Sequence, residues 1–209
     1  NQDEYYAVYK SAVPDRFSDL LIKKEDKFFY YHFGINPIST IRAIGKYIVG
    51  YKTPASSTIT QQLVKILRNS EFDRSIKNKM VEALYAMSFE VKLSKDEILA
   101  MYVNSIYFGN QTQGLTTASK LYFDTTQQAL TDQNIVQLVT AIPSPSLNNP
   151  FTKTNIDQSY ALAQNLGIEF EKNDIDINDI KDRQNQFKEY ARTTSAFEVE
   201  KIEQACKLL

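Results

Sequence analysis

Apolar residues recur every three to four positions along most of the chain, which is the spacing of helices with one buried face. Strand-like alternation is scarce, so any sheet should be small. The fold class that we predict is therefore mainly α. The spans with helical spacing are 19–32, 35–51, 57–69, 74–93, 94–106, 116–123 and 133–142.

Two of these helices carry a start signal. Thr58 with Gln61, and Ser94 with Glu97, have the spacing of capping boxes, in which two side chains satisfy the first free backbone groups of a helix. In the helix predicted over 74–93, Glu82 falls opposite the apolar stripe. Glu82 is therefore not forced into the core, which leaves a cleft and plain solvent as its two alternative environments.

The chain changes character at about residue 151, where Asn, Asp, Gln and Lys become frequent. We predict that residues 1–150 form the core of one domain and that residues 151–209 form a helical C-terminal extension of it. The 209 residues are 43% hydrophobic and carry a formal net charge of -1. This balance is typical of a globular protein and gives no global attraction to nucleic acid.

No apolar run is long enough to span a bilayer. Because the chain starts at Asn1 rather than Met, we expect a trimmed chain from which an upstream membrane anchor has been removed. The single cysteine, Cys206, excludes an internal disulfide.

The acidic pair Glu25-Asp26 precedes a run of aromatic residues that ends at His32. A carboxylate among aromatic side chains is suited to proton transfer near neutral pH, although a solvated acid beside a core stripe is the commoner case. His32 is the only histidine, so a metal site built on histidines is excluded, and a serine triad lacks its nucleophile elbow. Two carboxylates remain for acid–base chemistry, which favours glycosyl transfer, glycoside cleavage or a similar displacement.

The segment from Ser57 to Gln62 places hydroxyls and amides in the first turn of a helix, where they could bind sugar hydroxyls or phosphate. Arg74 and Lys79 lie near Glu82, and such a cluster suits a pyrophosphate leaving group. Taken alone, the first segment also fits a simple capped helix and the second a solvated charged face.

Taken in order, these segments resemble the peptidoglycan glycosyltransferases, family 51 of the glycosyltransferases. This family includes the first catalytic domain of class A penicillin-binding proteins and the monofunctional transglycosylases. Five motifs between Glu25 and Pro150 carry the resemblance: Glu25-Asp26-x-x-Phe29-x-x-His32-x-Gly34, Ser57-Thr58-Ile59-Thr60-Gln61-Gln62, Lys79-x-x-Glu82, Lys95-x-x-Ile98-Leu99-x-x-Tyr102-Val103-Asn104, and Ala141-Ile142-Pro143 with Asn149-Pro150. One departure is Gln111, which stands where the family usually has glycine.

The resemblance implies a lysozyme-like, two-lobed helical fold whose small lobe faces the membrane, and we place 35–51 in that lobe. It implies that lipid II is polymerised into glycan strands, with Glu25 as general base and Glu82 supporting the departure of undecaprenyl pyrophosphate. The substrate-binding residues that it implies are Asp26, Ser57, Gln61, Gln62, Lys65, Arg74, Lys79 and Asn104.

The same resemblance implies no required cofactor, with a divalent cation (Mg²⁺ or Mn²⁺) at the pyrophosphate as the alternative. The implied partners are lipid II, the growing strand, the membrane surface and other cell-wall synthesis proteins, but no nucleic acid. The implied location is the outer face of the bacterial cytoplasmic membrane. Two rival functions remain open at this point: a lysozyme-like enzyme that cleaves glycan, and a degenerate module that binds lipid II without turnover.

Overall fold

The computed structural model describes residues 13–37, 57–68, 76–172, 182 and 185. The chain divides into two compact units, residues 1–106 and 107–209, which are considered separately below. The predicted domain boundary at residue 150 does not coincide with this division, and it stays a prediction. The described part of the chain is mainly helical, which confirms the predicted fold class.

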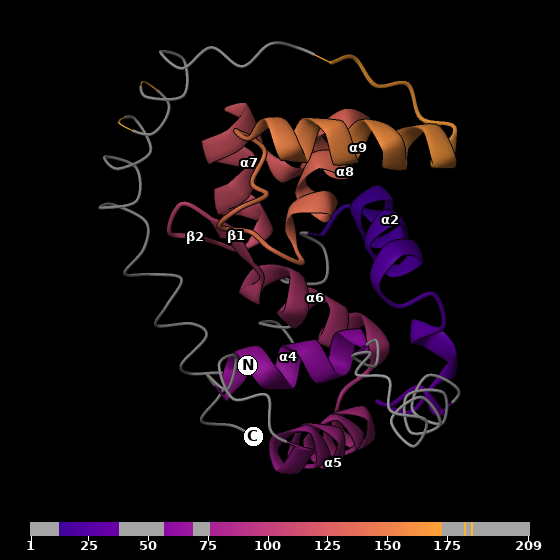
Figure 1. Cartoon of the computed structure of the whole chain (residues 1–209). Helices are drawn as coiled ribbons and strands as arrows, with labels where there is room; N and C mark the ends of the chain where they lie inside the picture. The colour runs from indigo at the N-terminus through magenta and orange to yellow at the C-terminus, as the bar shows by residue number, and fades with distance from the viewer. Residues whose placement is uncertain (1–12, 38–56, 69–75, 173–181, 183–184, 186–209) are drawn as a thin grey trace. The chain divides into compact units, whose positions relative to one another are not determined.

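Unit 1 is built around α4 (Ile59–Leu67), which packs against both α5 (Ile76–Lys92) and α6 (Lys95–Ser105) (Figure 1). Two further elements precede these helices, namely α2 (Asp15–Glu25) and a short 3-10 turn (Phe29–Tyr31). The buried side chains of the three packed helices are mostly aliphatic, so apolar burial stabilises this arrangement. They include Ile59, Leu63, Val64, Ile98, Leu99 and Val103.

Both predicted capping boxes are present. Thr58 accepts a hydrogen bond from the Gln61 backbone N–H, and the Gln61 side chain accepts one from the Thr58 backbone N–H. Ser94 and Glu97 form the same reciprocal pair at the start of α6. The first turns of α4 and α6 are therefore fixed by their own sequence.

The helix predicted over 19–32 is wrong at its C-terminal end, because α2 stops at Glu25. Asp26 leaves the helical conformation (φ -152°, ψ 72°), and its side chain accepts a hydrogen bond from the backbone N–H of Ile59 at 2.9 Å. The chain then passes through the 3-10 turn to Gly34, whose φ is +81°. His32, predicted to lie in a helix, instead lies in extended backbone after that turn. Periodicity missed the stop because aromatic residues continue beyond it.

Gly34 allows the chain to approach α5 closely. A Cβ on Gly34 would lie 2.7 Å from the backbone carbon of Ala86, a distance that no real side chain tolerates. Only glycine therefore fits between this loop and α5 without moving one of them.

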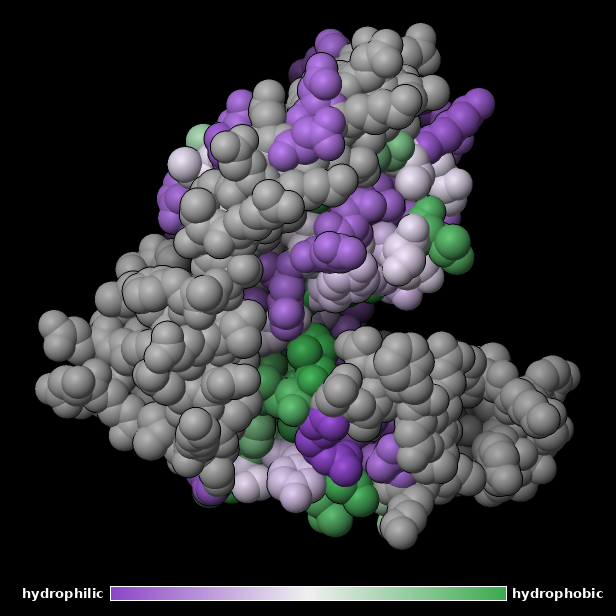
Figure 2. Space-filling model, turned by 90° about the vertical axis from the view of Figure 1, so that its left-hand side faces the viewer, coloured by the Kyte–Doolittle hydropathy of each residue, from purple (hydrophilic) through white to green (hydrophobic). Residues whose placement is uncertain are grey.

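In α5, the structure excludes plain solvent as the environment of Glu82. Glu82 is buried, with 3% of its surface exposed, whereas Met80, Leu84 and Val91 are 65%, 62% and 72% exposed. The helix thus turns Glu82 inward and most of its apolar stripe outward. Figure 2 shows hydrophobic side chains, in green, beside strongly hydrophilic ones on the lower part of the visible face, at the level of unit 1.

Unit 2 begins with a hairpin of β1 (Tyr107–Gly109) and β2 (Thr112–Gln113), the small sheet of the described residues. Its turn contains Asn110 and Gln111, both with positive φ (50° and 61°). Gln111 therefore occupies a left-handed position that glycine adopts with less strain.

Helices complete unit 2. They are α7 (Leu115–Phe123), a 3-10 turn (Gln127–Ala129), α8 (Asp132–Ala141) and α9 (Lys153–Leu166). α8 packs against α9, and Asn155 of α9 donates to the backbone carbonyls of Gln137 and Asn148 within this buried layer. None of the helices in the described ranges is both long and apolar enough to cross a bilayer.

Candidate active site

Glu25 is the last residue of α2, and its carboxylate has a partner on each oxygen. The Gln62 side-chain amide of α4 donates to Oε2 at 3.3 Å, and the Lys24 ammonium lies 3.4 Å from Oε1. The Glu25 side chain retains 15% exposure. Burial lowers the pKa of Lys24, while the adjacent Glu25 carboxylate acts in the opposite direction. Both partners hold the carboxylate in one orientation, which a general base needs.

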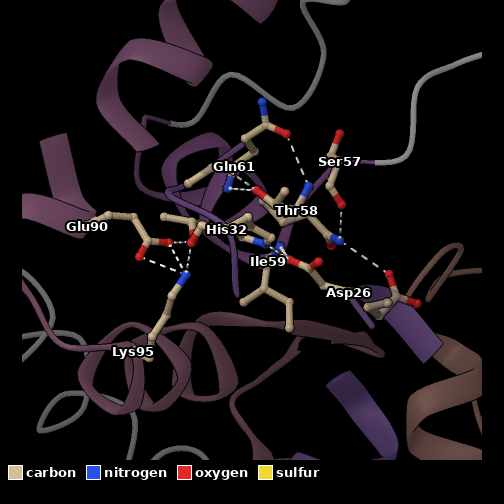
Figure 3. Close-up of polar contacts among 12 residues, drawn as sticks. Asp26, His32, Ser57, Thr58, Ile59, Gln61, Glu90 and Lys95 are labelled. Atoms are coloured by element: carbon tan, nitrogen blue, oxygen red, sulfur yellow. Dashed lines mark hydrogen bonds and ion pairs between the residues drawn. The ribbon is translucent and has the colours of Figure 1, made fainter. Parts of the chain in front are cut away.

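Asp26 anchors the loop that follows Glu25 to the start of α4 (Figure 3). Its Oδ2 accepts from the Ile59 backbone N–H at 2.9 Å and lies 2.7 Å from Nε2 of His32. Both side chains of this pair are about 4% exposed. Because a carboxylate at a helix N-terminus is stabilised by the free N–H groups there, Asp26 acts as a fixed anchor rather than as a second base.

Lys95 holds the same loop through a second set of contacts. The ammonium of Lys95, from α6, donates to the backbone carbonyl of His32 at 2.7 Å and to Glu90 at 2.8 Å (Figure 3). Thr60 also donates to Glu90 at 2.6 Å, and Lys95 lies 4.6 Å from the centre of the Phe29 ring. The loop that follows the candidate base is thereby tied to α4, α5 and α6.

Glu82 and Lys79 form the second charged group. The ammonium of Lys79 donates to Glu82 at 2.9 Å and to the hydroxyl of Ser57 at 2.6 Å. Lys79 remains 41% exposed at its side chain, whereas Glu82 is 5% exposed. The buried Glu82 carboxylate thus holds the ammonium of Lys79. This ammonium is partly exposed and has a third N–H that can donate to a phosphate oxygen.

The segment from Ser57 to Gln62 connects the two carboxylates. Its last residue donates to Glu25, and its first residue accepts from the lysine that pairs with Glu82. The structure therefore brings together five of the residues singled out from the sequence: Glu25, Ser57, Gln62, Lys79 and Glu82.

The other predicted site residues have different positions. Gln61 is buried and its amide oxygen closes the capping box, so its contacts there are structural. Asn104 donates to the Ala100 carbonyl of its own helix at 2.8 Å. Lys65 is half-buried one turn beyond Gln62 on α4. Arg74 lies outside the described residues.

Tyr102 of α6 contacts the site, although the sequence analysis named it only as part of a motif and gave it no role. It is 1% exposed, and its hydroxyl donates to the Gln62 amide oxygen at 2.6 Å. The apolar spacing of α6 explains the ring but not the hydroxyl. A tyrosine on a fully buried stripe needs a partner for its hydroxyl, and this is the signal that could have been followed.

A mainly helical protein that holds two acids at either end of a hydroxyl- and amide-rich helix start fits the class of enzymes that act on sugars. Comparison with known proteins agrees. The family model described as Transglycosylase matches residues 1–166. The chain therefore belongs to the transglycosylase family, the peptidoglycan glycosyltransferases.

Curated relatives of the chain are penicillin-binding proteins. Over 156 residues it is 36% identical to penicillin-binding protein 1B of Haemophilus influenzae, which covers 72% of this chain and 20% of the relative. It is 34% identical over 153 residues to penicillin-binding protein 1A of Neisseria cinerea, covering 71% and 19%. The corresponding protein of Aquifex aeolicus is 34% identical over 151 residues, covering 72% and 20%. The chain spans about a fifth of the length of these relatives.

Proposed function

We propose that this chain polymerises lipid II into glycan strands and releases undecaprenyl pyrophosphate. The observation that carries the proposal is the segment from Ser57 to Gln62, which contacts Glu25 at one end and, through Lys79, Glu82 at the other. Membership of the transglycosylase family supplies the reaction class.

In this proposal Glu25 removes the proton from the sugar 4-hydroxyl of the acceptor lipid II. The freed electron pair of that oxygen attacks the anomeric carbon of the growing strand. The bond from that carbon to the pyrophosphate oxygen breaks, and its electron pair leaves with the undecaprenyl pyrophosphate. The contacts with Gln62 and Lys24 hold the Glu25 carboxylate in place before substrate arrives.

Lys79 supplies positive charge for the leaving group. Its ammonium is held by Ser57 and Glu82, and its partial exposure leaves a donor for a phosphate oxygen. Charge that is fixed in advance costs no reorganisation when the bond breaks. Among the described residues, no group of three or more His, Cys, Asp or Glu side chains is placed to hold a metal ion. A divalent cation (Mg²⁺ or Mn²⁺) at the pyrophosphate stays a prediction.

The membrane surface is the proposed location of the reaction, on the outer face of the cytoplasmic membrane. The predicted membrane-facing segment 35–51 lies almost entirely outside the described residues. Within them, the exposed side chains of Met80, Leu84 and Val91 on α5 form the apolar stripe that best fits an interfacial surface. Other cell-wall synthesis proteins stay predicted partners.

The test is to incubate the purified chain with labelled lipid II in detergent and to follow two products, the glycan ladder and free undecaprenyl pyrophosphate. We expect both to appear together and both to be blocked by moenomycin, an inhibitor that the family suggests. Pyrophosphate release without a ladder, or shorter fragments from preformed glycan, would identify a hydrolase. Binding of lipid II without either product would identify a non-catalytic module.

A further inference from the structure

Lys95 opens the fourth sequence motif, and its ammonium has three contacts in the structure. It donates to the backbone carbonyl of His32 at 2.7 Å and lies 2.8 Å from the carboxylate of Glu90 (Figure 3). It also lies 4.6 Å from the centre of the Phe29 ring, which is fully buried. Because an ammonium has three N–H donors, these contacts match its full capacity. Lys95 therefore has the contacts of an anchor rather than those of a substrate-binding residue.

The ion pair between Lys95 and Glu90 is buried. Their side chains are 19% and 3% exposed, and the hydroxyl of Thr60, on α4, donates to Glu90 at 2.6 Å. Taking two charges out of water is costly, and apolar side chains of similar size often stabilise such a position equally well. What the ion pair adds is a defined geometry, in which one strong donor is aimed at the carbonyl of His32.

His32 connects Lys95 with the residue beside the candidate base. Its carbonyl accepts from Lys95, and Nε2 of its ring lies 2.7 Å from Oδ2 of Asp26. The same oxygen of Asp26 accepts from the backbone N–H of Ile59 at 2.9 Å. Through these direct contacts Lys95 fixes His32, and His32 fixes Asp26 against the first turn of α4.

Glu25 directly precedes Asp26, so the position of Asp26 limits where the candidate base can lie. The Glu25 carboxylate contacts Gln62, which belongs to the same helix, α4, that binds Asp26. We infer that Lys95 is a positioning residue for the reaction: it holds the loop of residues 26–34, so that Glu25 keeps its place against α4. The inference rests on the proposed role of Glu25 as the base, and it concerns the place of the carboxylate rather than its protonation.

The variant Lys95→Met removes the ammonium and keeps an unbranched side chain. We expect kcat for polymerisation to fall about tenfold, because a small displacement of a catalytic group costs rate. KM for lipid II should change by less than about twofold, because Lys95 does not bind substrate. Lys92→Met removes an exposed lysine from the end of α5 and is the matched control, with unchanged kcat and KM. A Lys95→Met protein with the wild-type kcat, or with a loss confined to KM, would overturn the inference.

A second variant separates positioning from stability. Lys95→Met alone leaves the Glu90 carboxylate buried without its cation, which can itself destabilise the fold. The double variant Lys95→Met/Glu90→Gln removes both charges and should recover most of the melting temperature. Its kcat should stay low, because the carbonyl of His32 still lacks its donor. If kcat recovers together with the melting temperature, Lys95 serves stability alone and the inference is wrong.

Hydrogen exchange of the full chain tests the loop without turnover. Two backbone hydrogen bonds of 2.8 Å lie within the loop, from Phe29 to Asp26 and from Tyr31 to Phe28. Exchange over residues 22–34, measured by mass spectrometry, should become about tenfold faster in Lys95→Met and in the double variant, and stay unchanged in Lys92→Met. Unchanged exchange in Lys95→Met contradicts the inference. A wild-type chain that does not polymerise lipid II, but whose variants show the expected exchange, contradicts only the proposed reaction and supports the hold of Lys95 on the loop.

Discussion

α4 and α5 pack against each other and carry Gln62 and Lys79, one partner of each candidate acid, yet they use their apolar residues in opposite ways. In α4 the stripe of Ile59 and Leu63 is fully buried. In α5 the stripe of Met80, Leu84 and Val91 is largely exposed, and Glu82 is buried instead. Periodicity thus shows where a stripe lies on a helix but not which way the helix faces.

The reason for the difference lies in the contacts of Glu82. Its carboxylate pairs with Lys79, which also donates to Ser57 just ahead of α4. Because this polar contact faces α4, the opposite side of α5 lies at the surface. Ala86 and Phe89 supply the buried apolar contacts of α5.

The largest expected effect comes from the buried stripe of α4. Leu63 is 0% exposed, so Leu63→Ala should lower the free energy of unfolding by about 2–5 kcal/mol, because it removes apolar contacts and leaves a cavity. Leu84→Ala on α5 is the matched control and should change stability by less than about 0.5 kcal/mol. Urea unfolding of both variants measures the comparison, and equal losses would show that the two stripes are buried alike.

A smaller effect is expected from the charged contact between the helices. Lys79→Met leaves the Glu82 carboxylate buried without its cation and should cost about 1–3 kcal/mol, toward the lower end because Lys79 is partly exposed. Adding Glu82→Gln should restore most of that loss, since the uncompensated charge is gone. If the double variant is as unstable as Lys79→Met, charge pairing is not what holds Glu82 inside.

Thr58, the N-cap of α4, should contribute about 1 kcal/mol to the free energy of unfolding. Thr58→Ala removes the cap of the helix and also the 2.7 Å hydrogen bond that its hydroxyl donates to the Gly34 carbonyl. Thr58→Ser keeps both contacts and should retain most of the stability. Thermal unfolding of both variants tests this, and equal melting temperatures of Thr58→Ala and Thr58→Ser would contradict the capping account.

The smallest effect on stability is expected from the exposed stripe. The double variant Met80→Ser/Leu84→Ser should leave the melting temperature nearly unchanged while reducing binding to anionic lipid vesicles, because it removes apolar area from the proposed interfacial surface. Leu147→Ser changes a still more exposed leucine of unit 2 and serves as control. Flotation with vesicles decides: equal binding by all three proteins would remove α5 from the membrane-facing surface.

Local signals in the sequence predicted much of unit 1. The capping boxes at Thr58 and Ser94 depend only on neighbouring residues, so they could be found without the fold. The end of α2 at Glu25 could not, because it depends on Asp26 contacting Ile59, a residue 33 positions away. The inward position of Glu82 depends in the same way on Ser57 and α4.

The candidate site shows the same division. Glu25, Gln62 and Lys79 were singled out by residue type and order. In the structure, Glu25 and Lys79 both contact the segment from Ser57 to Gln62. Gln61 was predicted both as a capping residue of α4 and as a substrate-binding residue. Its side-chain oxygen makes the capping contact. The contact of the Tyr102 hydroxyl could not be predicted, because its partner Gln62 is 40 residues away.

The most direct test of the account is the rate of glycan polymerisation by Glu25→Gln, measured beside the wild-type chain and the control Glu169→Gln, which changes an exposed glutamate of unit 2. The substitution keeps the size of the side chain but removes the base, so the account predicts a rate at least about 100-fold below wild type with unchanged thermal unfolding. Glu169→Gln should keep the wild-type rate. A Glu25→Gln protein that polymerises lipid II at nearly the wild-type rate would contradict the assignment of Glu25 as the base.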